Sequence, residues 1–520
     1  MKKWAVAIPA AFLGYFFFYP LVTVLWTSLS GADTSIGDVL GNAGLRSVAW
    51  FTFWQAGLST ILTLAAALPA AYVVARYDFP GRGMFRAGVL VPFMLPTIVV
   101  AAAFVALWGP GGAVGFRIDN TVWAILVAHV FFNFAVVVRT VGTLWQHIDP
   151  RLEEAATMLG ASRGEAFRRV TLPLLRPALA AAAAIVFLFS FTSFGIVLVL
   201  GGPTTATLEV EIYRQATALL NFEVAAVLAI VQLIGVVSIL ALYARFQDAA
   251  AHSLTLVPPR KPRPGPERRA VMVVVSASSA FLLAPLAVLV ARSLQNSALG
   301  WRSLGGSTLT VSPISAVGNS LRFAAVATAI AMVVGLAAAA TIAYRKTRSS
   351  RWFDALLMLP LGTSAVTLGF GFLVALDAPI DLRSWWMLVP IAHALVAIPF
   401  VVRLVAPVVR SIPPRLREAA AMLGASPAQI WRRVDVPIAS PAALAATGFA
   451  FAVSMGEFGA TAFTARPDAP TVPVAIFRLL ARPGAIPFGQ AMALSVMLMV
   501  ITAAIVGGLD RARFGQLGRF

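Results

Sequence analysis

Apolar runs of about 20 residues recur along the whole 520-residue chain and constrain its fold more than any other feature. A bilayer-spanning helix needs about 20 mainly apolar residues. Inside lipid, helices and closed barrels are the only structures that pair every backbone N–H and C=O group, and runs of this length favour helices. We therefore expect an all-α integral membrane protein with about twelve transmembrane helices, six in each half of the chain. The runs lie near 4–29, 51–75, 87–108, 121–143, 178–200, 223–244, 270–291, 321–344, 353–376, 385–405, 441–465 and 487–508.

The distribution of charge predicts the orientation. Only 12% of the residues are charged, whereas soluble domains carry about 25%. The net charge of +19 could indicate a nucleic-acid surface. However, if the N-terminus is cytoplasmic, most of the 40 Lys and Arg residues fall on the cytoplasmic side, as the positive-inside rule predicts. We therefore expect a multi-pass membrane protein, surrounded by lipid, with both termini cytoplasmic and no nucleic-acid partner. The run after Met1 is too long for a signal peptide and is interpreted as an uncleaved first span.

The chain contains an internal repeat with a constant offset of 264 residues. This offset pairs Met94-Leu95-Pro96 with Met358-Leu359-Pro360, and His129 with His393. Six spans per repeat return the chain to the same side, so the two repeats are parallel. The predicted domains are a first six-span repeat at 1–247, a Pro- and Arg-rich cytoplasmic linker at 248–269 and a second six-span repeat at 270–520.

The most similar stretch of the two repeats lies in predicted cytoplasmic loops at 149–173 and 413–437. Residues 150–173 and 414–437 are identical at 15 of 24 positions. In the first loop Asp149-Pro150 is expected to start a helix, with Glu153 reaching back to the cap, and Gly160 to end it. A second capping box at Ser162 and Glu165 starts another short helix, which Leu172-Pro173 is expected to end. The second loop repeats this pattern, with Gly424 ending its first helix and Ser426 and Gln429 starting its second. A polar loop retained in two copies indicates that each copy meets the same partner.

These loops resemble the "EAA" signature of bacterial ABC importer permeases. The first copy has Glu154-Ala155-Ala156, Gly160, Val170 and Leu172-Pro173, whereas the second has Val436-Pro437 in place of the final Leu-Pro. The resemblance covers nearly all of both halves and implies the type I importer permease fold in a fused form, located in the bacterial inner membrane. It also implies that each loop contains a coupling helix that docks on an ATPase subunit. The residues that it assigns to docking are Glu154, Ala155, Ala156, Met158, Leu159, Gly160, Glu418, Ala419, Ala420, Met422, Leu423 and Gly424.

The resemblance also implies partners and excludes catalysis by the chain alone. The sequence has no Gly-Lys-Ser or Gly-Lys-Thr, so it lacks that type of phosphate-binding loop. We expect two copies of an ATP-binding-cassette ATPase, which would bind ATP and Mg, together with an extracytoplasmic solute-binding protein. With no Cys and four scattered His residues, no metal site or cofactor is expected in this chain.

Fused permeases of this length resemble the thiamine and ferric-iron branch of importers. Short stretches such as Phe53-Trp54-Gln55-Ala56 and Ser454-Met455-Gly456-Glu457-Phe458-Gly459 are similar to thiamine permeases, which makes thiamine or a related cationic metabolite the preferred cargo and ferric iron the alternative. Ser193, Phe194, Glu457 and Phe458 are the candidate residues of the transport path. A carboxylate in a span is costly and usually functional, so Glu457 either faces a cationic cargo, or pairs with an Arg or lies at the membrane edge for structural reasons. A secondary transporter with two six-span halves is the rival of another class.

Overall fold

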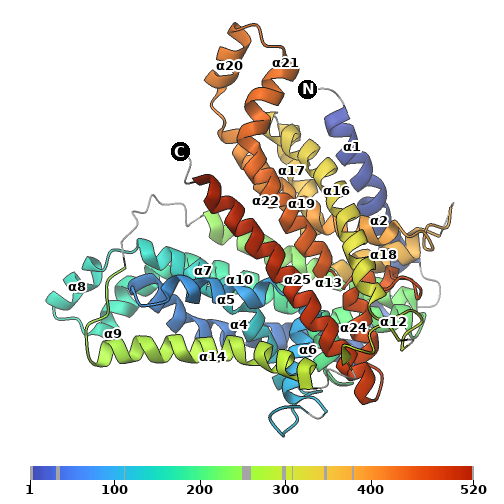
Figure 1. Cartoon of the computed structure of the whole chain (residues 1–520), viewed down its shortest axis with the longest axis horizontal. Helices are drawn as coiled ribbons and strands as arrows, with labels where there is room; N and C mark the ends of the chain where they lie inside the picture. Colours follow the sequence, from blue (N-terminus) through green and yellow to red (C-terminus); the bar gives the residue numbers. More distant parts are fainter. Residues whose placement is uncertain are drawn as a thin grey trace. The chain divides into compact units, whose positions relative to one another are not determined.

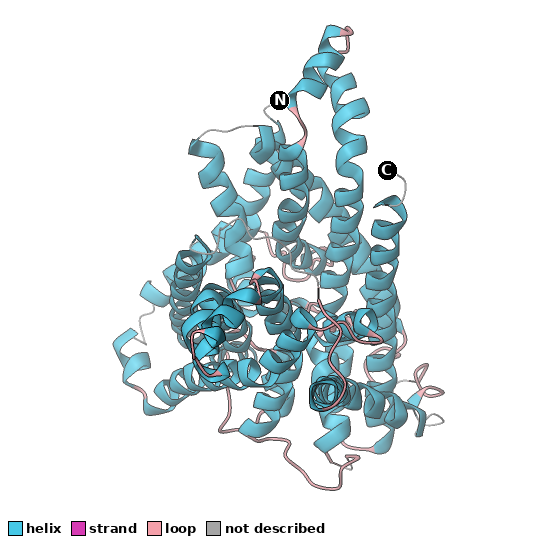
Figure 2. Cartoon of the chain, turned by 90° about the vertical axis from the view of Figure 1, so that its left-hand side faces the viewer, coloured by secondary structure: helices cyan, strands magenta, loops and turns pink. Residues whose placement is uncertain are grey.

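The computed structural model describes residues 4–30, 36–110, 112–248, 259–295, 300–306, 308–344, 348–377 and 380–517. Within these ranges the chain is helical, and their one extended pairing is an isolated bridge between Tyr77 and Arg260 (Figure 2). Ten of the described helices are long and apolar enough to cross a membrane, or up to twelve if each of two bent helix pairs forms one span. The predicted all-α membrane class is confirmed.

The two bent pairs correct the expectation of continuous helices near 87–108 and 353–376. The first pair is α5 (Arg82–Met94) with α6 (Thr97–Trp108), bent by 99°. The second comprises α17 (Arg348–Gly362) and α18 (Ala365–Ala375), bent by 89°. In the first pair Leu95 is extended, with ψ at 144°, because the residue before a proline avoids the helical region.

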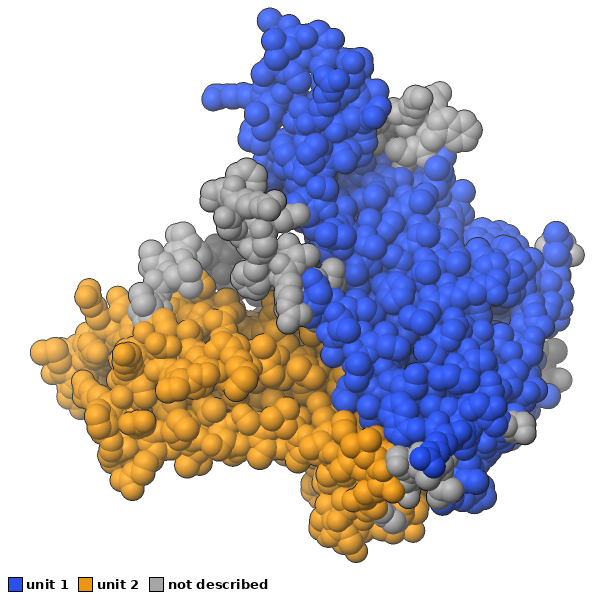
Figure 3. All heavy atoms as spheres, in the orientation of Figure 1, with its two compact units in different colours: residues 1–39, 212–230, 296–520 blue, residues 40–211, 231–295 orange. Residues whose placement is uncertain are grey.

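The chain folds into two compact units, coloured separately in Figure 3. Unit 2 comprises residues 40–211 and 231–295. Besides α5 and α6, its helices are α4 (Ala43–Arg76), α7 (Val122–His147), α8 (Arg151–Met158), α9 (Arg163–Ala166), η2 (Phe167–Thr171), α10 (Leu172–Phe191), α11 (Gly195–Leu200) and α14 (Pro266–Gln295), and unit boundaries fall inside α12 (Leu208–Thr217) and α13 (Phe222–Asp248). The long helices α4, α7 and α10 pack against one another, and α14 packs against α6, α4 and α5.

Unit 1 comprises residues 1–39, 212–230 and 296–520. Besides α17 and α18, its helices are α1 (Trp4–Leu13), η1 (Gly14–Phe18), α2 (Tyr19–Ser30), α3 (Ile36–Gly41, across the boundary), α16 (Ser315–Tyr344), α19 (Leu388–Ser411), α20 (Pro414–Met422), α21 (Pro427–Ile430), η3 (Trp431–Asp435), α22 (Val436–Gly456), α23 (Thr461–Thr464), α24 (Val472–Leu480) and α25 (Ala485–Leu517). Its core repeats the three-helix arrangement with α16, α19 and α22, and Leu13 and Phe17 pack against them. Close packing uses small residues, as is usual between membrane helices: a Cβ on Gly335 would lie 2.7 Å from Val401.

The two compact units do not coincide with the two sequence repeats. The first helix of the first repeat, α1 with α2, belongs to unit 1, and the first helix of the second repeat, α14, belongs to unit 2. Of the predicted linker at 248–269, residues 249–258 lie outside the described ranges. Beyond them, Arg260 pairs with the end of α4, donating its N–H to the carbonyl of Arg76 at 3.0 Å, and α14 already begins at Pro266.

Three π-helical segments share one sequence feature. η1, η2 and η3 are each followed two residues after their end by a proline, namely Pro20, Pro173 and Pro437. The ring of a proline clashes with the carbonyl four residues earlier in a regular α-helix, and the wider π turn removes that conflict. The expectation that Leu172-Pro173 ends a short helix is therefore wrong, because Arg163–Phe191 is one helix of 29 residues.

Candidate functional site

The two loops at 149–173 and 413–437 form the hairpins that the sequence predicts; we name them the first and second docking hairpins. In the first, Gly160 has φ of +90° between α8 and α9. Ser162 then accepts the N–H of Glu165 at 3.3 Å, and the Glu165 carboxylate accepts the N–H of Ser162 at 3.0 Å. In Figure 1, α8 and α9 lie at one end of unit 2.

The second docking hairpin repeats this geometry with different side chains. Gly424 has φ of +80°, and Ser426 and Gln429 form the reciprocal capping box with distances of 3.4 and 2.8 Å. Figure 1 shows α20 and α21 at the far end of α22, and Figure 3 shows this end as a projection of unit 1. Both capping boxes and both left-handed glycines are confirmed.

The tips of both hairpins carry apolar side chains that the described residues leave uncovered. Met158 and Leu159 are 89% and 90% exposed, and Met422 and Leu423 are both 88% exposed. The neighbouring signature residues show the same pattern in both copies: they are exposed except for Ala156 and Ala420, which are half-buried. The two hairpins therefore expose the same apolar pair at the same place.

The base of the first hairpin differs from the expectation for Glu153. Its carboxylate does not reach back to the helix start; it accepts a hydrogen bond from the hydroxyl of Thr171 and lies 3.8 Å from the guanidinium of Arg76. The cap is supplied by Asp149, whose carboxylate accepts the N–H of Arg151 at 2.9 Å. Spacing alone could not show this, because the partners of Glu153 come from η2 and α4.

The base of the second hairpin holds another polar cluster. Arg417 donates from Nε to the carboxylate of Asp435 at 2.8 Å, and the hydroxyl of Tyr344 donates to the same carboxylate at 2.5 Å. The guanidinium of Arg417 also lies 4.8 Å from the centre of the Tyr344 ring. Asp435 is 2% exposed, so this cluster is largely withdrawn from water.

Among the path candidates, Glu457 lies in a buried network. It occupies the break between α22 and α23, so the predicted span at 441–465 is not one helix. Its carboxylate accepts the N–H groups of Ala460 at 2.8 Å and Thr461 at 3.1 Å, as well as the Thr461 hydroxyl, and lies 3.2 Å from Nε2 of His393. The structure thus brings Glu457 together with a histidine and a helix start, and the expected alternative of an Arg partner is not what these contacts show.

The other path candidates lie at corresponding helix breaks. Ser193 and Phe194 separate α10 from α11 in unit 2, so the predicted span at 178–200 is also interrupted. Phe458 follows Glu457 in unit 1, and its ring centre lies 5.7 Å from that of Phe477. All three side chains are at most 6% exposed.

Both buried histidines bond between helices. His129 on α7 lies 3.0 Å from the hydroxyl of Ser59 on α4. His393 lies 2.7 Å from each of the hydroxyls of Ser454 and Thr461. Both rings are 1% exposed. The His129 ring therefore joins two helices through a hydroxyl group, and the His393 ring joins three.

Sequence reasoning missed two buried carboxylates on α12, in a segment taken as a connection between spans. Glu209 and Glu211 are each 1% exposed, and Glu209 accepts a hydrogen bond from the amide of Gln232. The available signal was apolar residues four apart, Leu208, Ile212 and Ala216, all fully buried. That period predicts a packed helix, whose other positions then bury polar groups.

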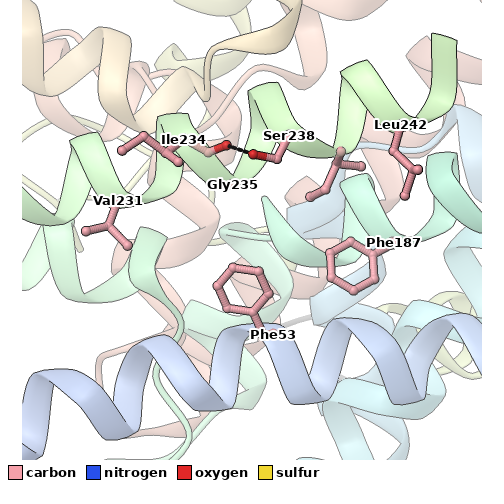
Figure 4. Close-up of a pocket in the computed structure, with 8 residues that line it drawn as sticks. Phe53, Phe187, Val231, Ile234, Gly235, Ser238 and Leu242 are labelled. Carbon is pink, nitrogen blue, oxygen red and sulfur yellow. Dashed lines mark hydrogen bonds between the residues drawn. The ribbon is translucent and has the colours of Figure 1, made fainter. Parts of the chain in front are cut away.

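A pocket of about 410 Å³ lies in unit 2 between α4, α10 and α13. Figure 4 shows the rings of Phe53 and Phe187 below Gly235 and Ser238 of α13. Its lining has no charged side chain, and it contains none of the predicted path residues. Phe53 belongs to one of the stretches that resemble the thiamine branch, but the pocket offers a cation only aromatic faces.

Comparison with known proteins supports one family over both halves. The family model described as "Binding-protein-dependent transport system inner membrane component" matches residues 67–251 and 331–513. The thiamine transport system permease protein ThiP of Brucella abortus (strain 2308) is 29% identical over 494 residues, covering 90% of this chain and 88% of the relative. The protein of the same name from Escherichia coli (strain K12) is 27% identical over 457 residues, covering 84% and 83%.

A solved bacterial ABC transporter involved in the import of the acidic polysaccharide alginate also matches, with a TM-score of 0.36 and 18% identity over 46% of this chain and 90% of that chain. The family match covers more than half of the chain, in two copies that fall in the two sequence repeats. This assignment replaces the secondary-transporter alternative and implies an ATPase and a periplasmic binding protein as partners. The chain therefore belongs to the binding-protein-dependent transport inner-membrane components, as the multi-pass inner-membrane permease subunit of an ABC importer, with two permease repeats fused in one polypeptide.

Proposed function

We propose that this permease moves thiamine or a related cationic metabolite from a binding protein into the cytoplasm. The support is the length of the similarity: the two thiamine permeases match over 90% and 84% of the chain, through both repeats and the region between them. Ferric iron, the alternative from sequence, has no comparable support among these relatives. Similarity over most of the chain therefore supports thiamine as the cargo.

The single observation that carries the coupling role is the pair of exposed apolar tips. Met158-Leu159 and Met422-Leu423 are nearly fully exposed on hairpins of almost identical geometry. Exposed Met and Leu side chains suit insertion into a groove on a partner, and two matched hairpins suit two copies of one ATPase. ATP and Mg would bind to those subunits.

Continuity between hairpin and span provides the mechanical link. The helix from Arg163 runs without interruption to Phe191, and the helix from Pro427 runs to Gly456. A displacement imposed on either hairpin is therefore carried into a membrane helix. We propose that closure of the ATPase dimer moves both hairpins and opens the permease outward, and that hydrolysis returns it to the inward state. Cargo shifts this equilibrium only by its different affinity for the two states, so the permease need not bind cargo tightly.

The helix breaks are the proposed transport-path segments. Phe194 and Phe458 offer aromatic faces, which attract cations within about 6 Å of the ring centre. Ser193 adds a hydroxyl next to Phe194. The engaged oxygens of Glu457 support a positioning role, in which the carboxylate shapes the break beside Phe458.

The test is reconstitution of the chain in proteoliposomes with the ATPase encoded beside it and with candidate binding proteins. Binding protein loaded with thiamine is expected to stimulate ATP hydrolysis and thiamine uptake, whereas empty binding protein is not. Stimulation by ferric-iron-loaded protein instead would reject thiamine and select the iron alternative. Uptake driven by an ion gradient without ATP would reject the coupling role of the hairpins.

A further inference from the structure

The polar clusters at the bases of the two docking hairpins occupy matching positions. Glu153 and Arg417 are related by the repeat offset of 264, and so are Thr171 and Asp435. The first position lies on the first helix of its hairpin, and the second at the end of the π segment that leads into the span. Each cluster therefore joins the hairpin to the span that follows it.

The third members, Arg76 and Tyr344, also correspond, although the repeat offset does not pair them. Gln146 and Arg410 are related by the offset, and each donates to a carbonyl on the preceding long helix: Gln146 to Val74 at 3.3 Å, and Arg410 to Ile342 at 3.4 Å. Arg76 lies two residues after Val74, and Tyr344 lies two residues after Ile342. Each cluster thus takes one side chain from the hairpin helix, one from the start of the span and one from the end of the preceding long helix.

The chemistry at these places is permuted between the copies. The first hairpin has an acid on the hairpin helix, a hydroxyl at the start of the span and a base on the preceding helix, which are Glu153, Thr171 and Arg76. The second has a base, an acid and a hydroxyl at the same places, which are Arg417, Asp435 and Tyr344. Acid, base and hydroxyl are all retained, and each has moved by one place.

We infer that these triads are positioning groups that hold each docking hairpin in register with its span, so that movement of the hairpin reaches the membrane. Three observations support this. The three side chains of each triad come from three separate segments, so no single helix holds them together. The central hydroxyl Thr171 and the central carboxylate Asp435 are at most 2% exposed, where interactions are little screened by water. The hairpins also have few buried apolar residues to hold them in place, since α8, α20 and α21 contain none.

The permutation makes the two hairpins chemically distinct at their bases while their tips remain alike. The same residue type therefore has opposite effects at matching positions. An acid at position 153 completes the first triad, whereas an acid at position 417 would lie against the carboxylate of Asp435. This inference rests on the docking role proposed above for the tips, and its experiment separates the two.

The experiment uses the full chain and three variants of the second triad. Arg417→Glu breaks the triad by bringing two acids together. The triple variant Tyr344→Arg, Arg417→Glu, Asp435→Thr installs the acid, hydroxyl and base order of the first hairpin. Arg415→Glu makes the same charge change on an exposed residue of the same helix and is the matched control.

Amide hydrogen exchange of residues 414–430 in the purified chain reports on the hairpin without any ATPase. Exchange is expected to be roughly tenfold faster in Arg417→Glu, and within about twofold of wild type in the triple variant and the control. In proteoliposomes, cargo moved per ATP is expected to fall roughly fivefold in Arg417→Glu and to recover in the triple variant.

The inference would be overturned if hydrogen exchange in Arg417→Glu were as slow as in the wild type, or if the triple variant exchanged as fast as Arg417→Glu. If the triple variant does not fold, a double variant with the charges swapped, Arg417→Asp with Asp435→Arg, takes its place. Failure of that double variant to restore wild-type hydrogen exchange would also overturn the inference. A different result is that Arg417→Glu speeds hydrogen exchange while loaded binding protein never stimulates the wild-type chain. That result would reject the proposed function but keep the structural role of the triad.

Discussion

His393 and Glu457 face each other inside unit 1, with Nε2 of the imidazole 3.2 Å from Oε2 of the carboxylate and both side chains at most 4% exposed. The repeat offset places His129 and Ser193 at these positions in the first half. There His129 contacts the hydroxyl of Ser59 instead. The halves therefore share a buried histidine and differ in its partner.

Replacing Glu457 with Gln is expected to destabilise unit 1. The amide group can accept through one atom only, so at least one of the N–H groups of Ala460 and Thr461 loses its partner, at a cost of about 1–3 kcal/mol. Thermal unfolding in detergent measures this, with Asp468→Asn as the control, because Asp468 is an exposed acid of the same unit. An unchanged melting temperature with a raised KM for cargo would instead place Glu457 in contact with the substrate.

The left-handed glycines give a second prediction. Gly160→Ala and Gly424→Ala place a Cβ at φ of +90° and +80°, which costs about 1–2 kcal/mol although no atom lies within 4 Å. The turn should open more often, and ATPase binding should weaken by roughly fivefold to thirtyfold. Gly164→Ala is the matched control, since Gly164 is helical and equally uncrowded. Equal loss in all three variants would show that the backbone angle is not the cause.

Removal of the apolar tips should separate binding from folding. The double variant Met158→Ser, Leu159→Ser is expected to weaken copurification of the ATPase at least tenfold, as loss of a binding hot spot does. The melting temperature should stay near wild type because both side chains are about 90% exposed. The control is Met84→Ser, another exposed methionine of unit 2. Normal ATPase binding by the double variant would contradict the docking role.

Topology can be measured directly because the chain has no cysteine. If the N-terminus is cytoplasmic, as the positive-inside rule predicts, Lys261→Cys in the linker should react with an impermeant maleimide only after the cells are opened. Val114→Cys, after the bent pair α5 and α6, should react from outside in intact cells. Protection of Val114→Cys in intact cells would mean that the bent pair is re-entrant and does not cross the membrane.

Features that depend on neighbours in sequence were predictable. The long apolar runs specified the helices, and local spacing specified the hairpins through Ser162 with Glu165, and Ser426 with Gln429. The positive φ of Gly160 followed from the same local pattern.

Features that depend on tertiary contacts were not predictable from spacing. Glu153 stands where a capping acid would, yet its carboxylate bonds to Thr171 and lies beside Arg76, which come from other segments. Glu457 breaks its span because its carboxylate binds the next helix start, and an apolar run does not reveal such a break. The burial of Glu209 required knowledge that α12 packs against Gln232 of α13.

The exchange of first helices between repeats and units has a consequence for how firmly the two repeats are joined. A break in the chain between the repeats would leave two fragments, each holding part of both folded units. Separating those fragments would require extracting α1 and α2 from one core and α14 from the other. The covalent connection therefore fixes a one-to-one ratio of two repeats that their own helices already hold together.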